Sequence, residues 1–173
     1  DRSMRNDIDG PLYKNEVAAY EVAKLLDLAD YVPPTSVKIV DEEVGSIQEW
    51  VEDAEAVSQY STVLDSVFEL EAIQDCALFN ALIGNEDRHG LNMLAKDGAP
   101  MLIDHGYAFP NQARPNYSRS VFVRFLQDKN EDNLSAHHAD MLDDFLANKN
   151  EFAEHLSNFL GKREIASMFV RAE

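Results

Sequence analysis

The sequence predicts a mixed α+β fold in two parts: a small N-terminal part over residues 1–58 and a larger, mainly helical part over residues 59–173. Two observations support this division. Apolar residues recur at helical spacing in several separate segments, whereas two other stretches have the short apolar runs and turn residues of β-hairpins. A chain of 173 residues that is 45% hydrophobic can form one compact domain or two small lobes around a cleft.

The composition excludes several classes of protein. There are 32 acidic and 15 basic residues, and the formal net charge of −17 disfavours binding to nucleic acid or to an anionic membrane. A single cysteine, Cys76, excludes an internal disulfide framework and fits a reducing compartment. No apolar run approaches eighteen residues and no signal peptide opens the chain, so we expect a cytoplasmic protein without a membrane span. Because the chain opens at Asp1, we also expect a processed, truncated or partly ordered product.

The N-terminal part begins with a predicted loop, residues 1–14, which contains the turn Asp9-Gly10-Pro11. A helix over residues 15–28 follows, because apolar side chains share one side at helical spacing: Ala18, Val22, Leu25, Leu26 and Ala29. Glu16 lies on another side of this helix. From residue type alone, it is an exposed acid favoured by the helix dipole.

A β-hairpin is predicted next, after Val32-Pro33-Pro34 ends the helix. Its strands are residues 35–40 and 44–51, joined by an acidic turn at 41–43. From its residue type, Trp50 in the second strand is predicted to be a buried packing residue. The polar residues 53–64 are predicted to connect the two parts of the chain.

A long helix over residues 66–83 opens the C-terminal part. The pattern Ser66-x-x-Glu69 is that of a capping box, and the second half of the segment is apolar almost all round. This helix should therefore run through the middle of the larger part, with Cys76 as a small core residue. It leads directly to Asp87.

The segment 84–109 has the composition of a functional site: a polar loop, two short strands and a second polar loop. Asp87 and Asn92 stand five residues apart in the first loop, and Asp104 follows the second strand. If the strands pair, three oxygen-bearing side chains converge. Mg²⁺ is usually held by one or two carboxylates together with substrate phosphates, so this pattern suits magnesium and phosphate. Phosphoryl transfer also needs a carboxylate for the attacking hydroxyl.

The motif Asp87-Arg88-His89-x-x-Asn92, followed by Ile103-Asp104-His105-Gly106, resembles the catalytic and metal-binding loops of the phosphatidylinositol 3-/4-kinase-like superfamily, which includes HipA-type kinases and actin-fragmin kinase. This resemblance implies a protein-kinase-like fold with a partial N-terminal lobe, and an ATP- and Mg²⁺-dependent (or Mn²⁺-dependent) phosphotransferase acting on a protein or small hydroxyl substrate. Asp87 would be the catalytic base, with Arg88 and His89 orienting its loop. Asn92 and Asp104 would bind the metal, and His105 would pack behind Asp104.

The resemblance extends to the N-terminal part. It implies that Glu16 pairs with a phosphate-binding lysine, and that the segment containing Gln48, Glu49, Trp50 and Val51 is a hinge whose backbone meets adenine. Two departures from the superfamily pattern stand out. His105 replaces the aromatic residue of many kinases, and no Gly-rich phosphate loop occurs in the 173 residues.

Two other functions remain open on the sequence. A catalytically silent pseudokinase that binds nucleotide or a partner would share the same motifs, and the expected place for the phosphate-binding lysine, N-terminal to Glu16, contains little sequence. Alternatively, His89 and His105 with Asp87 and Asp104 would form the transition-metal cluster of a hydrolase. The helical pair of histidines four residues apart that is typical of such sites is missing here.

Residues 105–127 contain no Asp or Glu and occupy the place of an activation or substrate loop. They carry Arg114, Arg119 and Arg124, which would either bind an anionic ligand or pair with the many surface acids. Beyond them, three apolar stripes between Met141 and Phe169 predict three amphipathic helices. The remaining histidines are predicted to be surface or structural residues: His137, His138 and His155.

Overall fold

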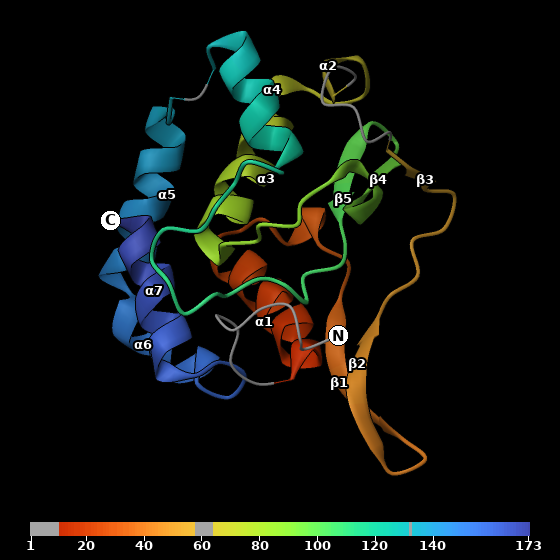
Figure 1. Ribbon diagram of the computed structural model, residues 1–173, viewed down its shortest axis with the longest axis vertical. Coiled ribbons are helices and arrows are strands. Elements are labelled where there is room, and N and C mark those ends of the chain that lie inside the picture. The colour runs from red at the N-terminus through yellow and green to blue at the C-terminus, as the bar shows by residue number, and fades with distance from the viewer. Residues whose placement is uncertain (1–10, 58–63, 132) are drawn as a thin grey trace.

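The computed structural model describes residues 11–57, 64–131 and 133–173, and it has a mixed α+β architecture (Figure 1). Two small antiparallel sheets lie on one side of a set of helices. The predicted boundary between residues 58 and 59 falls outside the described residues. Among those that are described, no helix has both the length and the apolar character needed to cross a membrane.

Helix α1 (Leu12–Leu25) begins three residues earlier than predicted, directly after Pro11. On its predicted apolar side Ala18, Val22 and Leu26 are buried and Leu25 is half-buried, but Ala19 and Ala23 on the side near Glu16 are also fully buried. Small alanine side chains allow other segments to pack closely on both sides of the helix. The prediction of one buried side was therefore incomplete. A short 3-10 helix, η2 (Ala29–Tyr31), follows.

The first predicted hairpin is confirmed. Strands β1 (Thr35–Val40) and β2 (Glu43–Gln48) pair from Thr35 opposite Gln48 to Val40 opposite Glu43. Asp41 and Glu42 form the two-residue turn, and both have positive φ, as a type I′ turn requires. β2 ends at Gln48, so the prediction of a strand to residue 51 was too long.

The predicted long helix is broken into two. Helix α2 (Leu64–Val67) is a single turn, and α3 (Leu70–Ile83) starts after an extended Glu69. The capping-box prediction was wrong, because Glu69 occupies the N-cap of α3 instead of the third helical position of a helix starting at Ser66. Phe68 is buried at this break and packs into the core, which favours a bend over a continuous helix.

The second sheet has the strand order β3 (Glu55–Ala56), β4 (Met93–Lys96), β5 (Ala99–Leu102). The predicted hairpin between the two polar loops is confirmed by β4 and β5, which pair from Met93 opposite Leu102. β3 lies in the segment predicted as a connector and adds a short third strand. It ties residues 55–56 to the strand that follows the first polar loop.

The helical part comprises α3, α4 (Val121–Lys129), α5 (Ala136–Ala147), α6 (Lys149–Leu156) and α7 (Lys162–Ala172). The three predicted C-terminal helices are confirmed. Helix α4 was not predicted, because residues 105–127 were interpreted as one loop. In the structure this loop ends at Ser120, whose hydroxyl caps the N-terminus of α4. One hydrophobic core contains buried residues from α1, α3, α4 and α7 together.

Candidate functional site

The first polar loop starts at a position that only glycine suits. Gly84 ends α3 with φ +69°, and a Cβ there would lie 2.8 Å from Cδ of Pro110. Asn80 and Asn85 then hold the start of the loop. Asn80 donates to the Asn85 carbonyl at 3.0 Å, and the Asn85 side chain accepts from the Asp87 amide at 3.0 Å. The helix end and Asp87 are thereby linked by backbone and amide contacts.

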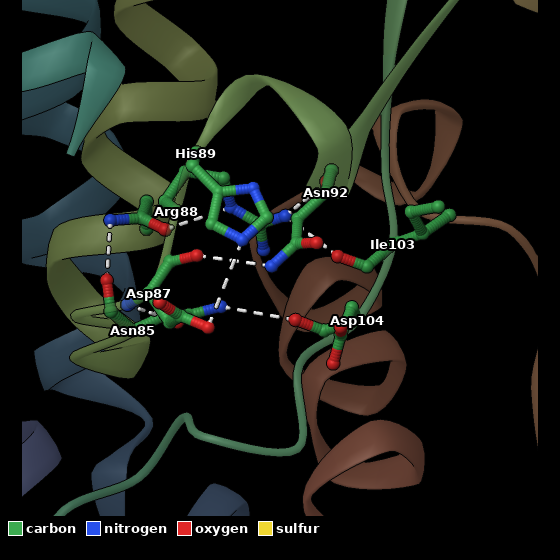
Figure 2. A network of polar contacts seen from close by, with 8 residues as sticks. Asn85, Asp87, Arg88, His89, Asn92, Ile103 and Asp104 are labelled. Carbon is green, nitrogen blue, oxygen red and sulfur yellow. Dashed lines mark hydrogen bonds and ion pairs between the residues drawn. The ribbon is translucent and has the colours of Figure 1, made fainter. Parts of the chain in front are cut away.

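Arg88 is the most connected residue of the site, and its side chain is fully buried. Its guanidinium donates to Oδ1 of Asn80 at 3.1 Å, to the carbonyl of Ile103 at 2.7 Å, and to the carbonyl of Asn92 (Figure 2). Burial lowers the pKa of Arg88 to about 10, so the group stays cationic at neutral pH. One planar cation therefore joins α3, the first polar loop and the residue before Asp104.

Asn92 and Asp104 are brought together by the same contacts. The Ile103 amide donates to the Asn92 carbonyl at 3.1 Å, so the residue before Asp104 is bonded directly to Asn92. The Asn92 side chain donates to the Asp87 carbonyl at 3.0 Å, which leaves its Oδ1 as the acceptor. The Asn85 side chain donates to the Asp104 carbonyl at 3.4 Å. Figure 2 shows Asn85, Asp87, Asn92 and Asp104 together with Arg88.

Asp104 has a backbone conformation that few residues adopt. Its φ is +57°, in the left-handed region, where Asp and Asn are tolerated better than most side chains. Strained positions of this kind cluster at ligand and metal sites. The Asp104 side chain is exposed, and its carboxylate makes no hydrogen bond with any described residue.

Asp87 is partly exposed at 32% of its side-chain surface, and His89 at 39%. The His89 Nε2 atom lies 3.9 Å from Oδ2 of Asp87, which is too far for a good hydrogen bond. The Asp87 carboxylate is therefore accessible to a substrate. His89 lies beside it.

His105, the residue after Asp104, is fully buried, and its ring packs at a tilted angle against Phe79 with the ring centroids 5.8 Å apart. Its Nδ1 atom lies 3.4 Å from the Arg88 guanidinium, which can only donate, so the proton of the neutral ring is on Nε2. Burial and the neighbouring Arg88 hold the pKa of His105 well below its usual value. The His105 ring therefore packs in the interior as an aromatic side chain does. It does not share the solvent-exposed position of the Asp104 carboxylate.

Glu16 is a part of this site and not an exposed helical acid, so that interpretation was wrong. Its carboxylate accepts a hydrogen bond of 2.9 Å from the His105 amide. Burial is the main cause of a raised pKa of Glu16, and the neighbouring Asp104 also raises it. Asn15 donates at 2.9 Å to the carbonyls of both Gly106 and Ala108. In the described part of the chain no lysine forms an ion pair with Glu16.

The predicted hinge starts at Gln48, the last residue of β2, and continues beyond the strand to Val51. Gln48 donates to the Thr35 hydroxyl at 2.9 Å, and the Glu49 amide donates to the Pro34 carbonyl at 2.8 Å. Trp50 is 85% exposed, so its interpretation as a buried packing residue was wrong. Val51 is half-buried, and the chain continues from it to β3. No hydrogen bond among the described residues joins this segment directly to Asp87, Asn92 or Asp104.

Loop 103–120 is attached to the first polar loop at several points. The Glu86 carboxylate accepts from the Asn116 amide and from the Gln112 side chain. The Val121 amide donates to the Arg88 carbonyl at 3.0 Å. Arg171 of α7 donates to the carbonyls of Leu82 and Gln112, both at 2.8 Å.

Several of these supporting residues were not anticipated from the sequence. They are polar residues that periodicity treats as interruptions or surface positions: Asn15, Asn80, Asn85, Glu86 and Arg171. Asn80 offered one local indication, because it stands alone within the apolar run Ala77-Leu78-Phe79-Asn80-Ala81-Leu82-Ile83. A lone amide in a buried helix needs a hydrogen-bond partner.

The chain was compared with known proteins. No protein-family model matches it. No curated protein sequence matches it either. Any function must therefore be argued from the geometry described above. Among the described residues, no three His, Cys, Asp or Glu side chains are grouped so that they could hold a metal ion.

Proposed function

We propose that this protein is an ATP- and Mg²⁺-dependent phosphotransferase with a protein-kinase-like fold, related to the phosphatidylinositol 3-/4-kinase-like superfamily. One observation carries the proposal. The buried Arg88 donates to the backbone carbonyls of Asn92 and Ile103, and so holds Asn92 beside Asp104. In this proposal Asn92 and Asp104 are the two oxygen ligands of the metal. The partly exposed carboxylate of Asp87 lies on the same loop as Asn92.

The donor atoms suit magnesium. Asn92 has its Oδ1 atom left as an acceptor, and Asp104 contributes an exposed carboxylate in a left-handed backbone conformation. Mg²⁺ prefers such oxygen ligands and keeps waters and substrate phosphates as its other ligands. When bound, the ion would neutralise negative charge on the nucleotide phosphates.

Asp87 is placed to act as the base. Its carboxylate is accessible, and its loop is held by Asn85, Asn92 and Arg88. In the proposed reaction the acceptor hydroxyl oxygen bonds to the γ-phosphorus of ATP, the bond from that phosphorus to the bridging oxygen breaks, and ADP leaves. The hydroxyl proton passes to Asp87. Orientation of the hydroxyl and removal of its proton together supply part of the rate enhancement.

Glu16 supports the same arrangement from α1. Its carboxylate accepts from the His105 amide, and Asn15 holds the next carbonyls, so α1 fixes the backbone directly after Asp104. In the superfamily that the motifs resemble, this glutamate pairs with a phosphate-binding lysine. We propose that the nucleotide lies between the hinge segment around Trp50 and the loops of Asp87 and Asp104.

The chain's single tryptophan provides the test. Trp50 is 85% exposed in the proposed hinge, so bound nucleotide should change its fluorescence. We expect a saturable change with Mg–ATP that EDTA abolishes. Asp104→Ala should lose the magnesium-dependent response. Asp87→Ala should keep the magnesium-dependent fluorescence response. It should slow the formation of ADP from ATP by roughly 100-fold or more, because a base acts mainly in the transition state.

Asp143→Ala, on the exposed face of α5, is the matched control, because it removes the same charge far from the proposed site. Calorimetry on the same proteins makes the result independent of fluorescence. If neither method detects Mg–ATP at millimolar concentration, the proposal is wrong. Binding without turnover by the unaltered protein would assign the silent nucleotide-binding function instead. Stoichiometric zinc in the purified protein would favour the hydrolase.

A further inference from the structure

Three arginines of the acid-free segment remain without acidic partners. Arg114, Arg119 and Arg124 are all exposed, and none forms an ion pair with any acid of the described residues. The interpretation that these arginines neutralise neighbouring surface acids is therefore not supported by the described ion pairs.

Of these three arginines, Arg119 lies in a short segment that is hydrogen-bonded to the loop of Asp87 on both sides of it. Three residues before it, the Asn116 amide donates to the carboxylate of Glu86; two residues after it, the Val121 amide donates to the carbonyl of Arg88. Glu86 and Arg88 are the two neighbours of Asp87. The short segment that carries Arg119 is thus attached at both ends to the residues on either side of the proposed base.

The segment between these two attachments is held by two further hydrogen bonds. The Ser120 amide donates to the Tyr117 carbonyl at 2.9 Å, which closes a turn around Ser118 and Arg119. The Tyr117 hydroxyl donates to the carbonyl of Ala81 at 2.7 Å, at the end of α3. Because consecutive residues span at most about 3.6 Å each, the Arg119 backbone lies within roughly 7 Å of the Val121 amide. The backbone of Arg119 is therefore held beside the loop that carries Asp87.

We propose that Arg119 is a specificity-determining residue that selects an acceptor carrying a carboxylate or phosphate group beside its hydroxyl. This inference rests on the proposed phosphotransferase function. The net charge of −17 repels an anionic substrate at long range, so a local cation is needed to offset that repulsion within a Debye length of about 8 Å. A planar guanidinium binds carboxylate and phosphate groups through two parallel hydrogen bonds.

The test measures binding of fluorescein-labelled serine peptides by anisotropy, without nucleotide. One peptide has glutamates on both sides of the serine, a second has glutamines, and a third has phosphoserines. We expect Arg119→Glu to weaken binding of the glutamate or phosphoserine peptide by roughly tenfold or more, since charge-assisted hydrogen bonds contribute about 1.5–3 kcal/mol. Arg119→Lys should retain part of the affinity. Whichever anionic peptide binds more tightly identifies the source of the negative charge.

Arg163→Glu is the matched control, because this exposed residue of α7 undergoes the same change in net charge. It should leave peptide affinity within about twofold, with the residual change due to long-range repulsion. Far-ultraviolet circular dichroism and thermal melts establish that each variant is folded, and Arg119→Gln provides a second variant without charge reversal.

The result separates the two proposals. If Mg–ATP does not bind but acidic peptides still bind through Arg119, the phosphotransferase function fails and the anion-binding surface stands. If Mg–ATP binds and turns over but Arg119→Glu and Arg163→Glu have equal peptide affinities, the role of Arg119 is overturned. Equal affinity of the unaltered protein for the glutamate and glutamine peptides would overturn it as well.

Discussion

The Glu16 carboxylate accepts a hydrogen bond of 2.9 Å from the amide of His105, a residue 89 positions further along the chain. Its neighbour Asn15 donates to the carbonyls of Gly106 and Ala108. Two consecutive residues of α1 thus hold a donor and two acceptors of the loop that follows Asp104. The position of α1 and the conformation of this loop are therefore linked.

Replacing Asn15 should release the loop. In Asn15→Leu the buried carbonyls of Gly106 and Ala108 lose their donor, and we expect the free energy of unfolding to fall by about 2–4 kcal/mol. Urea denaturation checks this, with Asn150→Leu on the exposed surface of α6 as the control, for which a change within about 0.5 kcal/mol is expected. Equal urea midpoints for the two variants would show that the Asn15 bonds contribute nothing.

Arg88 should not tolerate lysine. A lysine ammonium cannot reproduce the planar fork that donates to Asn80, Asn92 and Ile103, so at least one buried acceptor would lose its partner. We expect Arg88→Lys to lower the free energy of unfolding by about 3 kcal/mol or more. Arg163→Lys, at an exposed position, should change it little. An Arg88→Lys variant as stable as this control would contradict the structural role of the guanidinium.

Tyr117 should make the protein less stable in strong base. Burial raises the pKa of Tyr117 from its ordinary value near 10 to about 12. Between these two values the unfolded chain loses the phenol proton while the folded protein keeps it, so stability falls as the pH rises from 10 towards 12. At pH 11 this loss should reach about 1 kcal/mol, because one pKa unit corresponds to about 1.4 kcal/mol.

Tyr117→Phe isolates this effect from the titration of other groups. The variant loses the bond to the Ala81 carbonyl, at a cost of about 1 kcal/mol at pH 8, but it has no phenol to ionise. The difference in unfolding free energy between the unaltered protein and the variant should therefore shrink from pH 8 to pH 11. Urea denaturation at both pH values measures it, and an unchanged difference would show that the phenol does not titrate differently in the folded state.

Local patterns in the sequence determined most of the secondary structure. Turn residues and alternation predicted both hairpins, and apolar stripes predicted α1 and the three C-terminal helices, because these elements depend on contacts between near neighbours in the chain. The same patterns missed the break at Phe68 and Glu69 and the helix α4. Each of those depends on which side chains the rest of the core buries.

For the site, the sequence by itself predicted which residues would carry the proposed chemistry, because the spacing of Asp87, Asn92 and Asp104 was visible without coordinates. Only the tertiary structure decided how they are held. Arg88 was expected to orient its loop. Its burial and its bond to Ile103 could not be predicted, because they depend on how α3, β4 and β5 pack together. A buried polar group must be paired with whatever the fold places beside it, and partners such as Glu16 and His105, 89 residues apart, leave no trace in local periodicity.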